Sequence, residues 1–158
     1  MKNKNTLTLL VILIATLSGI AAFTGIASSD GKGPWKHTSV RGETVEIYGT
    51  GIYRHMSSDV AVQGIAQDYV TLFAAIPLLL LGLILARRHH LRGKFLLAGT
   101  SFYFFVTYLF YTAMGMYNAL FLIYTALIGL SFFVLAITLR GIDLSSLPQR
   151  FHEKTPVK

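Results

Sequence analysis

The chain contains four long runs of apolar residues, separated by stretches rich in polar and charged positions. Each run is close to the roughly 20 residues that an α-helix needs to cross the hydrocarbon core of a bilayer. Pro77 lies within the second run and predicts a bend there. The runs cover Thr6–Ser28, Tyr69–Ala86, Phe95–Tyr117 and Ala119–Leu139. The pattern predicts a single-domain, all-α membrane protein whose four transmembrane helices are residues 6–28, 68–87, 94–116 and 118–139.

The third and fourth runs carry polar residues at regular spacing. Buried tyrosine and hydroxyl side chains need hydrogen-bond partners, so a polar face is expected to point into the bundle. In the third run this face contains Thr100, Ser101, Thr107, Tyr108, Tyr111 and Gly115. In the fourth run the spacing is seven residues, which is typical of a packing seam between helices; the residues are Tyr117, Tyr124, Ser131 and Thr138.

Residues 29–67, between the first and second helices, are predicted to form a small cap outside the membrane. Residues 29–42 have no regular pattern. Val45 and Ile47 then alternate with polar neighbours, and an extended stretch resumes at Ile52 after a glycine-containing turn at 49–51, which predicts a β-hairpin around the glycines. Ser57 and Ser58 provide helix-capping side chains, so we expect a short separate helix near the membrane surface after them.

Basic residues indicate the orientation. The net charge is +7, and most positive side chains flank the predicted helices, as Lys2 and Arg140 do. Positive residues near helix ends favour the cytoplasmic side, so both termini and the tail at 141–158 are predicted to be cytoplasmic. This placement explains the basic charge without a nucleic-acid partner. Four residues of the loop between the second and third helices are expected to contact anionic lipid headgroups: Arg87, Arg88, Arg92 and Lys94.

Several classes of chemistry lack their sequence signals. The chain has no cysteine, which excludes disulfides, thiol redox catalysis and iron–sulfur ligation. No ionisable residue lies deep inside an apolar run, whereas such residues mark most ion-coupled pathways. No phosphate-binding loop, HExxH or GxSxG motif occurs. We therefore predict no catalytic residue, no metal site and no cofactor.

Five segments resemble a group of small bacterial four-helix membrane proteins that has no established activity. They are Gly42–Gly49, Gly51–Arg54, Gln67–Leu72, Arg92–Lys94 and Tyr117–Leu122. The resemblance extends over about residues 42–135. It implies a four-helix architecture and a location in the bacterial inner (cytoplasmic) membrane, and it carries no mechanism.

On the predicted topology, polar and aromatic residues converge on the outer half of the membrane. An aromatic pocket with a few convergent polar groups is the usual form of a ligand site. The alternative is that these groups satisfy one another and fasten the cap to the bundle. The candidates are Tyr48, Tyr53, Arg54, His55, Gln67 and Asp68 from the cap side, and Tyr108, Tyr111, Tyr117, Asn118 and Tyr124 from the last two helices.

Three functions are compatible with this pattern. The favoured one is a non-enzymatic protein that binds a lipid-like or small ligand, or a partner membrane protein. The partner can also be a second copy of the same chain, in a homo-oligomer. The favoured function predicts that Arg54, Tyr108 and Tyr111 face a shared cavity. The second is an oligomeric channel or small transporter that uses the polar face of the third helix. The third is a lipid-acting enzyme with Asp68 and His55 as an acid–base couple, although an ion pair of Asp68 with Arg54, or a helix cap, explains Asp68 more simply.

Overall fold

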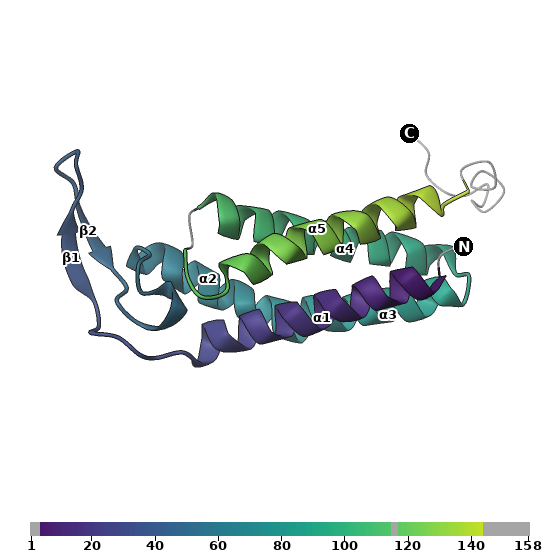
Figure 1. The fold of residues 1–158 in the computed structure, drawn as a ribbon, viewed down its shortest axis with the longest axis horizontal. Coiled ribbons are helices and arrows are strands. Elements are labelled where there is room, and N and C mark those ends of the chain that lie inside the picture. Colours follow the sequence, from purple (N-terminus) through teal and green to yellow (C-terminus); the bar gives the residue numbers. More distant parts are fainter. Residues whose placement is uncertain (1–3, 115–116, 144–158) are drawn as a thin grey trace, which may run out of the picture.

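The computed structural model describes residues 4–114 and 117–143. Within these ranges, four helices are long and apolar enough to cross a membrane, as the four apolar runs predicted. They lie side by side in an elongated bundle with a small cap at one end (Figure 1). The helices are α1 (Lys4–Ala27), a 30-residue helix over Ser58–Arg87, α4 (Leu91–Ala113) and α5 (Phe121–Arg140).

The second of these helices differs from the prediction. The expected short helix is not a separate surface element, because α2 (Ser58–Val70) continues through a π-helical turn, η2 (Thr71–Ala75), into α3 (Ile76–Arg87). In the wide turn the Ile76 N–H bonds the carbonyl of Thr71, five residues back. Proline has no N–H, and its ring excludes the carbonyl four residues back. The widened turn directly before Pro77 accommodates both restrictions, as π-bulges do in other helices.

The cap contains a hairpin, but not between the predicted strands. β1 (Trp35–Thr38) pairs antiparallel with β2 (Thr44–Ile47), so β1 lies in a stretch expected to be irregular. The expected second strand is instead the short 3₁₀ helix η1 (Gly51–Tyr53) and a turn. Gly49 and Gly51 have φ angles of 73° and 58°, and the Gly51 N–H bonds the Asp30 carbonyl at 2.7 Å. These bends turn the chain toward the end of α1, and it returns to the end of β2 only at Ser57, which forms an isolated bridge with Ile47.

The bundle core is built from the inner faces of all four long helices. α4 packs between α3 and α5, and α1 packs against α5, α3 and α2. The polar face of α4 is buried, as predicted, at Thr100, Ser101, Thr107, Tyr108 and Tyr111, while Gly115 lies outside the described residues. The seven-residue seam of α5 is buried at Tyr124, Ser131 and Thr138, whereas Tyr117 precedes the helix and is 75% exposed.

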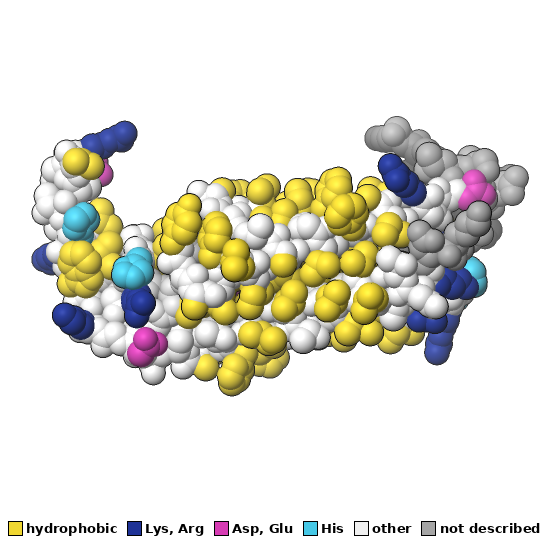
Figure 2. Space-filling view, in the orientation of Figure 1, with side chains coloured by type: hydrophobic (Ala, Val, Ile, Leu, Met, Phe, Trp, Pro, Cys, Tyr) yellow, Lys and Arg dark blue, Asp and Glu magenta, His cyan; other side chains and the backbone are white. Residues whose placement is uncertain are grey.

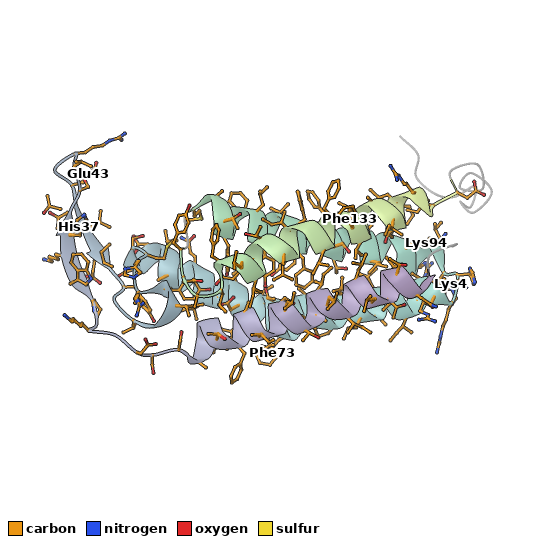
Figure 3. All side chains as sticks on the ribbon, viewed as in Figure 1. Lys4, His37, Glu43, Phe73, Lys94 and Phe133 are labelled. Atoms are coloured by element: carbon orange, nitrogen blue, oxygen red, sulfur yellow. The ribbon has the colours of Figure 1, made fainter. Side chains whose placement is uncertain are left out.

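Charged side chains are concentrated at the two ends of the bundle, and apolar side chains cover its middle (Figure 2). Lys4 and Lys94 lie at the end opposite the cap, while His37 and Glu43 lie on the projecting hairpin (Figure 3). α4 begins at Leu91 rather than at residue 94, so the basic residues at 92 and 94 belong to its first turn. The Lys94 ammonium donates to the Gly141 carbonyl at the end of α5. This cation therefore also ties two helices together.

Candidate functional site

A buried carboxylate joins the cap to the helices. Asp68 in α2 is only 3% exposed. The Tyr53 hydroxyl, from η1 in the cap, donates to Asp68 Oδ2 at 2.5 Å, and the Tyr111 hydroxyl of α4 lies 3.3 Å from Oδ1. Tyr111 also reaches the carbonyl of Gly64 at 3.2 Å. Cap, α2 and α4 therefore meet at one group of hydrogen-bonded atoms.

Two glycines make room for this group. A Cβ atom on Gly25 of α1 would lie 1.8 Å from Asp68 Oδ2, and a Cβ on Gly64 of α2 would lie 2.7 Å from the Tyr53 ring. At either position an added Cβ would force the neighbouring atoms to shift. The close approach of α1 to α2 therefore depends on glycine at position 25, and the seating of the Tyr53 ring depends on glycine at position 64.

Hydroxyl groups, rather than a cation, are the partners of the buried carboxylate. Burial raises the pKa of the Tyr53 hydroxyl well above its ordinary value, so Tyr53 keeps its proton and acts as a donor to Asp68. The expected Asp68–Arg54 pair does not form, because Arg54 is exposed and lies 3.7 Å from Asp30. Nor does Asp68 couple with His55, whose exposed ring accepts from Arg54 Nε at 3.2 Å. The acid–base pair required by the enzyme hypothesis is therefore absent from this group.

Three tyrosines extend the cluster into the bundle. The rings of Tyr108, Tyr111 and Tyr124 are mutually in contact, with centroid separations of 5.3 to 5.7 Å. Asn118, ahead of α5, lies within hydrogen-bond distance of the Tyr124 hydroxyl (3.3 Å) and the Ile52 carbonyl (3.4 Å). Aromatic contacts of this kind add stability beyond simple burial. This part of the predicted site fastens α4, α5 and the cap together.

A groove of about 710 Å³ lies between α2 and α4, beside the buried carboxylate. It exists because α4 packs along α3, whereas α2, on the other side of the π turn, packs against α1. α2 reaches α4 through side-chain hydrogen bonds, such as the one from Gln67 to Tyr103. One side is formed by α2, from Val60 to Gln67. The other is a single stripe of α4 at helical spacing: Gly99, Phe102, Tyr103, Val106, Thr107, Phe110, Tyr111 and Met114.

The groove combines an apolar surface with a neutral polar strip. Gln67 Nε2 donates to the hydroxyls of Tyr103 and Thr107, and Tyr103 also contacts the Thr71 hydroxyl at 3.0 Å. The Gln63 side chain, one turn before Gln67, makes no hydrogen bond to any residue that the structure describes. None of the described lining residues is charged. The groove therefore offers amide and hydroxyl groups to a ligand without an ionic contact.

The structure divides the predicted site into three parts. Tyr111 and Gln67 line the groove, and Tyr53, Asp68, Tyr108, Asn118 and Tyr124 lie behind it. Arg54 and His55 line a different pocket in the cap, so Arg54 does not share a cavity with Tyr108 and Tyr111. Tyr48 is half-buried in the cap, and Tyr117 stacks on Phe121 at the surface.

Some groove residues were outside the predicted site although the sequence contains a signal for them. Gln63 shares a helical face with Gln67 because the two are four residues apart. Tyr103 and Thr107 have the same spacing on α4. Gly25 had no comparable signal, since its role depends on a neighbour that is distant in the sequence. Among the described residues, no three histidine, aspartate or glutamate side chains gather as a metal site.

Comparisons with known proteins identified no relative of this chain. The sequence matches no family model, no curated protein is similar to it, and no solved structure matches its fold. The resemblance of five segments to small bacterial membrane proteins therefore has no support from these comparisons. The groove and its neighbouring residues are therefore the features from which we infer a function.

Proposed function

We propose that the protein is a non-enzymatic integral membrane protein whose lateral groove binds a neutral, lipid-like ligand. The setting proposed from the sequence is the bacterial inner membrane, with both termini cytoplasmic and the cap outside. In that orientation the groove opens sideways into the outer leaflet. The observation that carries the proposal is the groove itself, a space of about 710 Å³ between two helices of membrane-spanning length.

The lining indicates the chemical class of the ligand. Phe102, Phe110 and Met114 border the groove and are each about half exposed, so they can contact an apolar chain. The amides of Gln63 and Gln67 can hydrogen-bond a hydroxyl or carbonyl oxygen. A charged headgroup would find no counter-ion among the described lining residues and would lose its hydration there. The expected ligand has a long apolar body and one or two neutral oxygen groups.

The two alternatives have less support from the described residues. An oligomeric channel or small transporter would need the polar face of α4 to line a path between copies, but Thr100, Ser101 and Tyr108 of that face are buried within one chain. A lipid-acting enzyme would need Asp68 near His55, and one is buried while the other lies on the surface. A partner membrane protein remains an alternative occupant of the groove.

Two matched glycine variants test the proposal. A Cβ on Gly99 in the groove wall, and on Gly129 in α5 away from the groove, would meet no atom within 4 Å. Gly99→Leu should fill the groove and Gly129→Leu should not. Native mass spectrometry of protein extracted gently from its own membrane should show a lipid-sized adduct on wild type and Gly129→Leu. In Gly99→Leu the adduct should fall at least about fivefold, a loss of about 1 kcal/mol.

The outcomes separate the alternatives. Loss of the adduct in Gly99→Leu alone supports the groove as the lipid site. Equal adducts in both variants place the lipid elsewhere and contradict the proposal. A second protein that is lost in Gly99→Leu would show that the groove is a protein interface instead.

A further inference from the structure

The cap contains a second pocket, distinct from the groove between α2 and α4. Its volume is about 580 Å³. It lies where the segment that follows α1, residues 31–35, meets the segment that follows β2, residues 49–55. Neither the proposed lipid binding nor the buried Asp68 group uses it.

The walls of this pocket are held by tightly packed backbone. A Cβ on Gly31 would lie 2.1 Å from the Gly49 carbonyl oxygen, and a Cβ on Gly49 would lie 1.8 Å from the Gly33 carbonyl oxygen. Gly31 also forms an isolated antiparallel bridge with Thr50. The two segments therefore touch along their main chains, and the pocket rests on a fixed frame.

Every polar side chain that lines the pocket carries N–H donors. They belong to Lys32, Trp35, Arg54 and His55. Arg54 Nε donates to His55 Nε2 at 3.2 Å, which leaves the proton of a neutral His55 ring on Nδ1, where it can donate again. The Lys32 ammonium makes no hydrogen bond or ion pair with the described part of the chain. The pocket thus presents several donors and two permanent positive charges.

One nearby acid reduces this positive charge only weakly. Asp30 lies outside the lining and pairs with Arg54 at 3.7 Å, with side chains 76% and 53% exposed. Ion pairs this exposed contribute little, so an incoming anion can compete for the guanidinium. Arginine is well suited to this because its planar fork matches the oxygens of a phosphate.

From this arrangement we propose that the cap pocket binds a phosphate group. The phosphate can belong to the headgroup of an anionic lipid or to a soluble molecule, and both present the same oxygens to Lys32 and Arg54. Pro34 and Trp35 supply an apolar wall beside it. The site is independent of the groove ligand, which is neutral.

The chain carries its own reporter for this site. Trp35 is the only tryptophan in the sequence, and it lines the pocket. Its fluorescence should change saturably when a phosphate group binds. The full-length protein is placed in nanodiscs of phosphatidylcholine and titrated with inorganic phosphate. In a second arm, phosphatidylglycerol replaces part of the lipid and no phosphate is added.

Three sets of substitutions give the expected results. The double variant Lys32→Gln/Arg54→Gln should weaken the response at least about tenfold, because two charge-assisted contacts are lost. Lys36→Gln/Arg41→Gln removes the same charge from the hairpin, outside the pocket lining, and should keep the response. Asp30→Asn frees Arg54 and should strengthen the fluorescence response. If the Arg54–Asp30 contact were merely structural, the response would instead be lost in both Asp30→Asn and the pocket variant.

The two arms identify the source of the phosphate. A response to inorganic phosphate indicates a soluble ligand, and a response only to phosphatidylglycerol indicates a lipid headgroup. The proposal is overturned if wild type responds in neither arm, or if the pocket and hairpin double variants lose the response equally.

Discussion

At the scale of single residues, the burial of Asp68 is made possible by neighbours from four elements, α1, η1, α2 and α4. An ionisable group buried among packed helices is costly unless it finds partners, and here they are the hydroxyls of Tyr53 and Tyr111. Gly25 and Gly64 leave the space in which these atoms meet. Each of these residues therefore affects stability through the same small group of atoms.

Removing one hydroxyl tests the value of this arrangement. Tyr53→Phe should lower the free energy of unfolding by about 1–3 kcal/mol, because Asp68 loses a donor and stays buried. Tyr117→Phe is the control, since Tyr117 is 75% exposed and should change stability by less than about 0.5 kcal/mol. Thermal unfolding in detergent compares the two. Equal midpoints would mean that water or another group replaces the Tyr53 hydroxyl.

Gly25 offers a second test at the same scale. Gly25→Ala should destabilise the protein by about 1–3 kcal/mol, because the added Cβ would lie 1.8 Å from Asp68 Oδ2. Gly19→Ala in the same helix is the matched control. Its Cβ would meet only Ile76 Cδ1, at an ordinary 3.8 Å, and the unfolding midpoint should stay the same or rise. An unchanged midpoint in Gly25→Ala would contradict the close packing of α1 on α2.

At the scale of elements, the hairpin and the helices differ in what supports them. β1 is exposed at all four positions, and β2 is exposed at two of its four and half-buried at the others. Figure 1 shows the two strands projecting away from the bundle. A lone two-stranded ribbon is only marginally stable in water. α2, in contrast, buries Ala61, Gly64 and Asp68 against the rest of the molecule.

Hydrogen exchange should reveal this difference. The β1 and β2 amides should exchange early, whereas amides in the middle of α1 and α4 should remain protected longest. Replacement of residues 36–46 by a short glycine–serine linker should change the unfolding midpoint of the bundle very little. Protection of the hairpin equal to that of α1 would contradict this, and would mean that another chain covers it.

At the scale of the whole molecule, the distribution of charge sets the expected orientation. The N-terminal end of α1 and the C-terminal end of α5 lie at the same end of the bundle as the basic loop between α3 and α4 (Figure 1). The positive-inside tendency predicts that this end faces the cytoplasm. The pocket that contains Lys32 and Arg54 then lies on the opposite side, with the cap.

The absence of native cysteine makes this orientation directly measurable. Val40→Cys, at the exposed tip of the hairpin, should react with a membrane-impermeant maleimide in intact spheroplasts. His90→Cys, in the exposed basic loop, should react only after the membrane is opened. The two variants control for each other. The reverse pattern would invert the topology and place the groove in the inner leaflet.

The sequence by itself determined the four apolar helices, the buried faces of α4 and α5 and the existence of a cap, because length and periodicity are local properties of the chain. It predicted the strand at 44–47 but not its partner, since pairing depends on where the glycine bends send the chain. It also indicated most of the aromatic and polar residues of the candidate site, but not which of them lie together in the structure. Only the tertiary structure decided that Tyr53 rather than Arg54 meets Asp68, because that choice depends on how η1 packs against α1 and α2. The tertiary structure also decided the groove, because the groove depends on how α2 and α4 are placed relative to each other on the α2 side of the π turn. No single segment of the sequence encodes that placement.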